Sequence, residues 1–113
     1  MKIKKCPWGN YKVLHKEPGI QIKRIEIKPG LRFSLQKHLH RSEKWIVISG
    51  KGIVTLGKKK FPVKESLFFD VPKGTRHRMR NTGKNPLAFI EVQFGDYLGE
   101  DDIIRFEDDF GRS

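Results

Sequence analysis

The sequence has 113 residues, of which 33% are charged and 36% hydrophobic, and its formal net charge is +11 at pH 7. This length suits one core, and eight Phe, two Trp and two Tyr argue against a disordered chain, so we expect a single domain over residues 1–113. No stretch approaches the roughly 20 apolar residues that cross a bilayer, and no apolar run follows the basic start, so we expect neither membrane binding nor a secretory signal.

Short runs rich in β-branched and aromatic residues fill most of the chain, separated by turns that contain Gly, Pro or paired Lys. In chain order, strands are predicted at residues 11–15, 20–28, 32–38, 43–49, 52–56, 59–63, 66–71, 77–81 and 87–94. The tail then predicts a short helix or turn at residues 100–106, with apolar side chains that pack back on the strands: Ile103, Ile104, Phe106 and Phe110. Many short strands at this spacing predict an all-β sandwich or barrel.

Alternation within two predicted strands indicates a polar region inside the fold. Glu91 and Gln93 share one face of residues 87–94, opposite a face of apolar residues. Gln36 and His38 share one face of residues 32–38, opposite Phe33 and other apolar bulk. If these polar faces point inward, the barrel has a polar pocket on one wall.

Ligand-type side chains are concentrated in residues 36–43, with one more at position 77. Gln36 and His38 point the same way on a strand, about 7 Å apart, so both can reach one ion. Glu43 follows after a turn, and His77 follows a Pro/Gly corner that aims the first side chains of the next strand. Two imidazoles, a carboxylate and an amide oxygen suit one divalent ion, with Zn²⁺ our first expectation and Mn²⁺, Co²⁺, Ni²⁺ or Fe²⁺ as alternatives.

The spacing of these residues resembles the paired motifs of the cupin superfamily, G-x5-H-x-H-x(3,4)-E-x6-G and G-x5-P-x-G-x2-H-x3-N. The first motif is matched, with Gln in place of the first His, by Gly30, Gln36, His38, Glu43 and Gly50. The second is matched, with Ser in place of the leading Gly, by Ser66, Pro72, Gly74, His77 and Asn81. The resemblance implies a single cupin β-barrel (a jelly roll, or double-stranded β-helix), with a short C-terminal tail packed on it and the metal site inside.

Longer strings are similar to a narrower family, the C-terminal cupin domain of type II mannose-6-phosphate isomerases, which many bacteria fuse to a mannose-1-phosphate guanylyltransferase. The similar strings are Pro-Trp-Gly at 7–9, Lys-Arg-Ile at 23–25, Ser-Leu-Gln at 34–36, His-Arg-Ser-Glu-Lys-Trp at 40–45 and most of residues 91–112. The similarity spans roughly residues 6–112. Because 113 residues cannot hold the nucleotidyltransferase half, no guanylyl transfer is expected.

The resemblance implies an isomerase that interconverts mannose 6-phosphate and fructose 6-phosphate through an enediol, with the ion as electrophile. Glu91 and His40 are the candidate catalytic acid/bases, and Lys37, on the other face of its strand, is a third. A solvated or cross-strand-paired carboxylate is an equally good interpretation of Glu91. His40 could also be an alternative ligand or a group that supports the ligands.

Arginine is the natural bidentate partner of phosphate, and Arg24 and Arg105 are the candidate substrate-binding residues. Arg24 lies where alternation breaks in residues 20–28, which indicates a bulge or an inward-facing charge. The arginines that alternate with His77 are expected to face solvent or a partner chain: Arg76, Arg78 and Arg80.

Charge is distributed unevenly along the chain. Residues 1–94 hold 22 Lys or Arg against 6 acids, whereas residues 95–113 hold 2 against 7. The basic part indicates an anionic partner, and the acidic tail with no nucleic-acid motif favours a phosphorylated sugar over nucleic acid. The scattered lysines also resemble thermophile composition. The lone Cys6 excludes an internal disulfide and favours a reducing, cytoplasmic location.

We further expect a homodimer, with Trp8, Tyr11 and the tail Phe residues as candidate contacts. Two other functions stay open. One is a non-catalytic metal-binding cupin that binds or senses a sugar phosphate or sugar nucleotide. The other is a different cupin enzyme, such as another sugar isomerase or an Fe²⁺ oxygenase, although Gln36 departs from the His-His-Glu-His ligand set of such enzymes.

Overall fold

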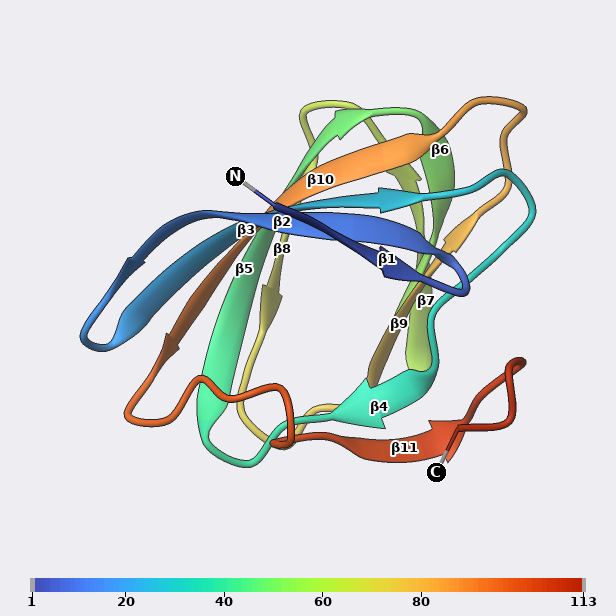
Figure 1. Ribbon diagram of the computed structural model, residues 1–113. Helices are drawn as coiled ribbons and strands as arrows, with labels where there is room; N and C mark the ends of the chain where they lie inside the picture. The colour runs from blue at the N-terminus through green and yellow to red at the C-terminus, as the bar shows by residue number, and fades with distance from the viewer. Residues whose placement is uncertain (1, 113) are drawn as a thin grey trace.

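The computed structural model describes residues 2–112, which form eleven strands and no helix. The strands are β1 (Ile3–Cys6), β2 (Gly9–Glu17), β3 (Ile20–Ile27), β4 (Leu35–Lys37), β5 (Arg41–Ser49), β6 (Lys51–Leu56), β7 (Lys59–Lys64), β8 (Phe68–Val71), β9 (His77–Asn81), β10 (Leu87–Gly95) and β11 (Ile104–Glu107). Two antiparallel sheets, β1-β2-β3-β10-β5-β8 and β11-β4-β9-β6-β7, face each other (Figure 1). The all-β prediction is confirmed. Within this range no helix has the length and hydropathy that crossing a bilayer requires.

The hydrophobic core lies between the two sheets and is built on aromatic rings. Trp45 of β5 is fully buried and packs against Phe89 of β10 at a ring-centroid distance of 5.0 Å and against Phe33 at 6.0 Å. Burying a Phe side chain such as Phe89 stabilises the fold by about 1.5–3 kcal/mol. Further large, fully buried apolar side chains come from both sheets: Ile27, Val47, Val54, Met79 and Leu87.

The interior becomes polar along the same strands that carry the core. On β10, Phe89 is followed on the inward face by Glu91 and Gln93, both buried. On β3, the inward face carries Gln21 and Lys23. Since Glu91 is the register partner of Lys23, strict alternation brings these polar groups together at one end of the barrel. The predicted polar pocket on one wall is confirmed.

Lys23 explains the break in alternation that the sequence shows at this point. It turns inward and is only 3% exposed, while Arg24 points outward. The pairing of β3 with β10 is regular, and the irregularity lies in β2 between Val13 and His15. Of the two predicted explanations, the inward-facing charge is therefore correct for β3.

The tail does not form the helix that was one of the two predictions for residues 100–106. A turn occurs at Glu100 and Asp101, and β11 then pairs with the edge of β4. The prediction of a helix was wrong because the open edge of β4 offers backbone partners that an isolated short helix lacks. The predicted strand 32–38 is reduced to β4, and β1, which pairs with β2, was not predicted.

Two turns have left-handed backbone geometry, and the first of them supports the site. Gly74 has φ = 75° and its N–H donates to the C=O of His38 at 2.8 Å, which holds the two motif segments together. Ser66 has φ = 69°, and its N–H donates to the C=O of Val47. A residue with a Cβ is strained at such φ. This strain explains why the second cupin motif begins with glycine, at the position where this chain has Ser66.

Candidate functional site

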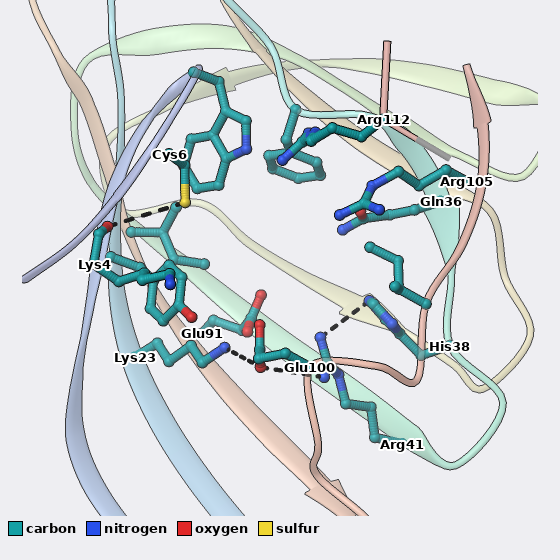
Figure 2. A pocket seen from close by; sticks show the side chains of 15 residues that line it. Lys4, Cys6, Lys23, Gln36, His38, Arg41, Glu91, Glu100, Arg105 and Arg112 are labelled. Carbon is teal, nitrogen blue, oxygen red and sulfur yellow. Dashed lines mark hydrogen bonds and ion pairs between the residues drawn. The ribbon is translucent and has the colours of Figure 1, made fainter. Parts of the chain in front are cut away.

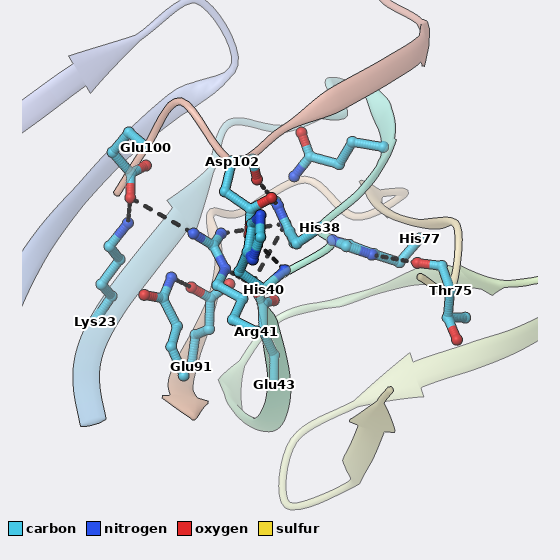
Figure 3. Close-up of polar contacts among 12 residues, drawn as sticks. Lys23, His38, His40, Arg41, Glu43, Thr75, His77, Glu91, Glu100 and Asp102 are labelled. Carbon is cyan, nitrogen blue, oxygen red and sulfur yellow. Dashed lines mark hydrogen bonds and ion pairs between the residues drawn. The ribbon is translucent and has the colours of Figure 1, made fainter. Parts of the chain in front are cut away.

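Three buried side chains converge at the polar end of the barrel: His38 just after β4, Glu43 on β5 and His77 at the start of β9. One nitrogen or oxygen atom from each lies within 4.8 Å of the others. Figure 3 shows the three labelled side chains together. Their convergence follows from topology, because β4 and β9 belong to one sheet and β5 to the other. Gln36 is the register partner of His77 in the pairing of β4 with β9. The spacing of the two motifs therefore predicted a real spatial cluster.

Both imidazoles are held through their Nδ1 atoms. Nδ1 of His38 lies 2.6 Å from the C=O of Asp102, and Nδ1 of His77 lies 2.9 Å from the C=O of Thr75. Because a carbonyl oxygen only accepts, each Nδ1 carries the proton and each Nε2 presents a lone pair. This arrangement is typical of metal-ligating histidines.

The electrostatics of the cluster keep both histidines neutral. Burial, and to a smaller extent the positive charge of Arg41, lowers the pKa of His38 to about 4. Burial lowers the pKa of His77 to about 4 as well. Nε2 of His77 is buried and has no hydrogen-bond partner within residues 2–112. A buried, neutral Nε2 that lacks a hydrogen-bond partner and lies beside a carboxylate suits a divalent ion. His38, Glu43 and His77 are therefore chemically suited to hold one.

Arg41 is the residue of this cluster that sequence reasoning missed. Its Nε donates to Oε2 of Glu43 at 2.7 Å, and its Nη2 lies 3.1 Å from Nε2 of His38. Oε1 of Glu43 accepts from Nε1 of Trp45 at 2.9 Å. The alternation of side chains along the strand could have indicated Arg41, because Arg41 is two residues from Glu43 and shares its face of β5.

Gln36 is half-buried beside the cluster. Its Oε1 accepts a hydrogen bond from Oγ of Ser34 at 2.8 Å. An amide oxygen has two lone pairs, so this bond leaves one available for an ion. Gln36 and His38 both line the adjoining cavity.

A cavity of about 230 Å³ opens next to the cluster (Figure 2). Trp8, Tyr11 and Phe33 contribute aromatic walls. Five cationic side chains from distant segments line it: Lys4, Lys23, Arg41, Arg105 and Arg112. Two carboxylates, Glu91 and Glu100, face the same space. A concave site with this excess of positive charge suits a small anionic ligand.

Glu91 is the most perturbed carboxyl group in the cavity. Burial, reinforced by the nearby Glu43 carboxylate, raises the pKa of Glu91 to about 7. Nε2 of Gln93 donates to its Oε1 at 2.5 Å, and Nε2 of Gln21 in turn donates to Oε1 of Gln93 at 3.3 Å. Glu91 is thus held in one orientation and can gain or lose a proton near neutral pH.

The structure brings only some of the other predicted residues to this cavity. Glu91 and Arg105 line it. Arg24 points away and forms an ion pair with Glu26 at 3.0 Å, because its neighbour Lys23 takes the inward position. His40 is exposed, and its ring contacts Tyr97 edge-on at a centroid distance of 6.0 Å.

Arg78 contradicts the expectation that it faces solvent. It is buried, and its Nε donates to the C=O of Phe33 at 2.9 Å. Its other two nitrogens donate to the side chain and the backbone C=O of Glu107 on β11, each at 2.9 Å. The tail strand covers this side of β9, which the sequence pattern of β9 alone could not indicate. Arg76 and Arg80 are exposed, as expected.

Comparisons with known sequences agree with this geometry. Residues 2–108 match the family model described as mannose-6-phosphate isomerase C-terminal. The chain is 50% identical over 107 residues to the xanthan biosynthesis protein XanB of Xanthomonas campestris pv. campestris, covering 95% of this chain and 23% of that protein. It is 51% identical over 107 residues to the alginate biosynthesis protein AlgA of Pseudomonas syringae pv. tomato, covering 95% and 22%. It is 44% identical over 106 residues to a mannose-1-phosphate guanylyltransferase of Klebsiella pneumoniae, covering 94% and 22%.

The chain spans less than a quarter of the length of these relatives. Among solved structures, it is similar to the Cnp3 cupin domain of Schizosaccharomyces pombe, with a TM-score of 0.73 and 24% identity over 77% of this chain and 64% of that one. The capsular polysaccharide assembling protein CapF of Staphylococcus aureus gives a TM-score of 0.79 and 22% identity, covering 94% and 34%. These likenesses show the fold alone. The fold is a cupin barrel, and the chain belongs to the mannose-6-phosphate isomerase C-terminal family.

Proposed function

We propose that this protein is a metal-dependent isomerase that interconverts mannose 6-phosphate and fructose 6-phosphate. The observation that carries the proposal is the buried cluster of His38, Glu43 and His77 beside a basic cavity that contains Glu91. Family membership supports the same substrate class. Because the named relatives are more than four times longer, their whole activities are not transferred to this chain.

Aldose–ketose isomerisation moves a proton between C1 and C2 of the open-chain sugar. Glu91 suits this role, because a carboxyl group with a pKa of about 7 is present in both protonation states at neutral pH. In the direction from aldose to ketose, its carboxylate accepts the C2 proton and the resulting acid returns it to C1. A proton also passes from the oxygen on C2 to the oxygen on C1. Gln93 fixes the Glu91 carboxyl group during both transfers.

A divalent ion would be held by His38, Glu43 and His77, with Gln36 as the fourth proposed ligand. When bound, it would act as a Lewis acid toward the oxygens on C1 and C2. Zn²⁺ is the first expectation, and Mn²⁺, Co²⁺, Ni²⁺ and Fe²⁺ also suit two imidazoles, a carboxylate and an amide oxygen. The chain contributes by fixing both Nε2 lone pairs through the two Nδ1 hydrogen bonds.

The cationic lining supplies the proposed anchor for the substrate phosphate. Arg105 lines the cavity from β11, and Arg112, whose Nε donates to Asp108 at 2.8 Å, lines it from the tail. Guanidinium groups bind phosphate oxygens in pairs, which fixes orientation as well as charge. Arg24 points away from the cavity, and His40 lies outside its lining, so neither is included in this proposal.

The test is a coupled isomerase assay with mannose 6-phosphate, run on protein loaded separately with Zn²⁺, Co²⁺, Mn²⁺ and Ni²⁺. We expect turnover with at least one ion and none after chelation. Stoichiometric metal without turnover of any sugar phosphate would overturn the isomerase proposal.

That result would favour the alternative, a metal-binding cupin that holds or senses a sugar phosphate or sugar nucleotide without turnover. The observation behind the alternative is the basic lining of the cavity, which suits a phosphorylated ligand whether or not turnover follows. Calorimetric binding of mannose 6-phosphate in the absence of turnover would support it.

A homodimer and a cytoplasmic location stay predictions. Trp8 belongs to the core and lines the cavity together with Tyr11. Two of the residues expected to form dimer contacts therefore make contacts within the chain. The outer face of β5 and β8 instead exposes Ile46 and its register partner Phe68, which is 70% exposed. Light scattering would test for the dimer. The lone, free Cys6 supports a reducing compartment.

A further inference from the structure

A surface carboxylate reaches into the cavity and contacts two buried cations. Glu100 lies between β10 and β11, in a segment outside both sheets. Its Oε2 accepts from Nζ of Lys23 at 2.6 Å and lies 3.9 Å from Nη1 of Arg41 (Figures 2 and 3). The Lys23 and Arg41 side chains are 4% and 5% exposed, whereas that of Glu100 is 54% exposed. The two cations belong to different strands, and only this carboxylate bridges them among the described ion pairs.

The two cations have more donors than one carboxylate can satisfy. An ammonium group has three N–H donors, and Nη1 of a guanidinium has two. Nη1 of Arg41 is buried and has no hydrogen-bond partner within residues 2–112. Lys23 is otherwise covered by the Tyr11 ring, whose centroid is 4.2 Å from Nζ. A tetrahedral oxyanion offers more acceptor atoms than a carboxylate and can reach both cations at once.

We propose that Lys23 and Arg41 form an oxyanion subsite inside the cavity, and that Glu100 occupies it until the phosphate group of a sugar phosphate displaces it. The inference rests on the proposed function only for the identity of this ligand. Glu100 is therefore a built-in competitor of the substrate. Because the substrate has one phosphate group, this subsite is an alternative to the Arg105 and Arg112 anchor for that group.

The local structure allows Glu100 to leave without unfolding the site. Two residues further on, the Asp102 carboxylate accepts from the backbone N–H groups of Leu39 and His40 at 3.0 and 2.9 Å. The Asp102 C=O also holds His38. The tail thus stays anchored at Asp102, and the exposed Glu100 side chain can turn to solvent.

The experiment measures binding of inorganic phosphate, mannose 6-phosphate and mannose to the full chain by calorimetry, after metal removal and dialysis. Glu100→Gln keeps the size of the side chain and removes its charge. We expect it to bind inorganic phosphate and mannose 6-phosphate about two- to fivefold more tightly, because a half-exposed charged competitor for the two cations is removed. Mannose, which has no oxyanion, should show no gain. The matched control is Glu65→Gln, at an exposed carboxylate in the turn before β8.

Adding Lys23→Gln to Glu100→Gln should abolish the gain, whereas adding Lys23→Arg should retain most of it, which separates loss of the subsite from loss of folding. Unchanged phosphate affinity in Glu100→Gln, or binding that is lost only on Arg105→Gln, would overturn the inference. Tighter phosphate binding by Glu100→Gln, together with no isomerase turnover when the protein is loaded with any of the four ions, would refute the proposed function and leave the subsite standing.

Discussion

Nη2 of Arg41 lies 3.1 Å from Nε2 of His38, the atom that would have to bind a metal ion. An Nε2 lone pair cannot accept from a guanidinium and coordinate an ion at the same time. The same guanidinium donates to Glu43 at 2.7 Å, so Arg41 holds two of the three clustered ligands. In the absence of metal, Arg41 therefore acts as a resident cation that balances the buried Glu43 carboxylate.

This relationship predicts that Arg41 competes with metal. Arg41→Gln should bind Zn²⁺ about tenfold more tightly, since one charged competitor is removed, and should be less stable than wild type when metal-free. Chelator competition measures the affinity, and urea unfolding measures the stability. Arg80→Gln, at an exposed arginine on β9, is the control. Weaker metal binding in Arg41→Gln would show that Arg41 positions Glu43 rather than competing with the ion.

His77→Ala should lose bound metal. It removes one of the three clustered ligand atoms, and the Nε2 it deletes is the one without a hydrogen-bond partner in the described chain. We expect affinity to fall by at least about 100-fold, more than the 10–100-fold typical of losing an outer supporting group. Metal analysis after dialysis measures it. His15→Ala, at an exposed histidine of β2, should retain the metal. Full retention by His77→Ala would refute the ligand assignment.

Stability of the metal-free protein should fall as the pH decreases from about 6.5 toward 4. In this window the unfolded state protonates two histidines, whereas burial keeps the pKa of His38 and His77 at about 4 in the fold. Glu91 acts in the opposite direction. Its pKa is raised from 4.5 to about 7, so the folded state holds a proton that the unfolded state releases, and its contribution grows on acidification.

Because two histidines destabilise the fold on acidification and one carboxyl group stabilises it, the net effect is a loss of stability. Glu91→Gln removes the opposing contribution and should make the loss of stability on acidification steeper than in wild type. Urea unfolding at a series of pH values between 4.5 and 6.5 measures both slopes. An equal or shallower slope in Glu91→Gln would contradict the raised pKa of this residue.

Ser66→Gly should stabilise the protein by about 0.5–1 kcal/mol. A residue with a Cβ is strained by roughly 1–2 kcal/mol in the left-handed region, and the extra freedom of glycine in the unfolded state offsets part of that gain. Ser66 has φ = 69°. Thermal unfolding is the measurement. The reverse change at a comparable turn, Gly57→Ala with φ = 62°, should destabilise it. A neutral or destabilising Ser66→Gly would mean that the serine hydroxyl contributes to the native turn.

Local patterns predicted most of the barrel and the outline of the site. Alternation located the strand that carries Glu91 and placed Glu91 and Gln93 on one face, which the structure shows to be buried. The motif spacing predicted that His38, Glu43 and His77 converge. These inferences succeed because a strand fixes the direction of each side chain every second residue, whatever the partner strand is.

The contents of the cavity could not be predicted in the same way. Lys23 and Arg24 are adjacent, and only the register of β3 with β10 decides that Lys23 faces inward. Arg78 is buried because β11 covers it, and Glu100 reaches Lys23 across a separation of 77 residues. Such contacts depend on which distant segments the fold places side by side.

The cluster of His38, Glu43 and His77 shows the same division. The sequence by itself determined which side chains of ligand type stand at the motif spacing, because residue chemistry and spacing are local properties. Only the tertiary structure decided that Arg41 already bonds to His38 and Glu43, and that both Nδ1 atoms are held by carbonyl groups from Asp102 and Thr75. Hydrogen bonds of buried groups depend on the direction and distance of neighbours, and the burial that shifts the pKa of these histidines exists only once both sheets have closed around them.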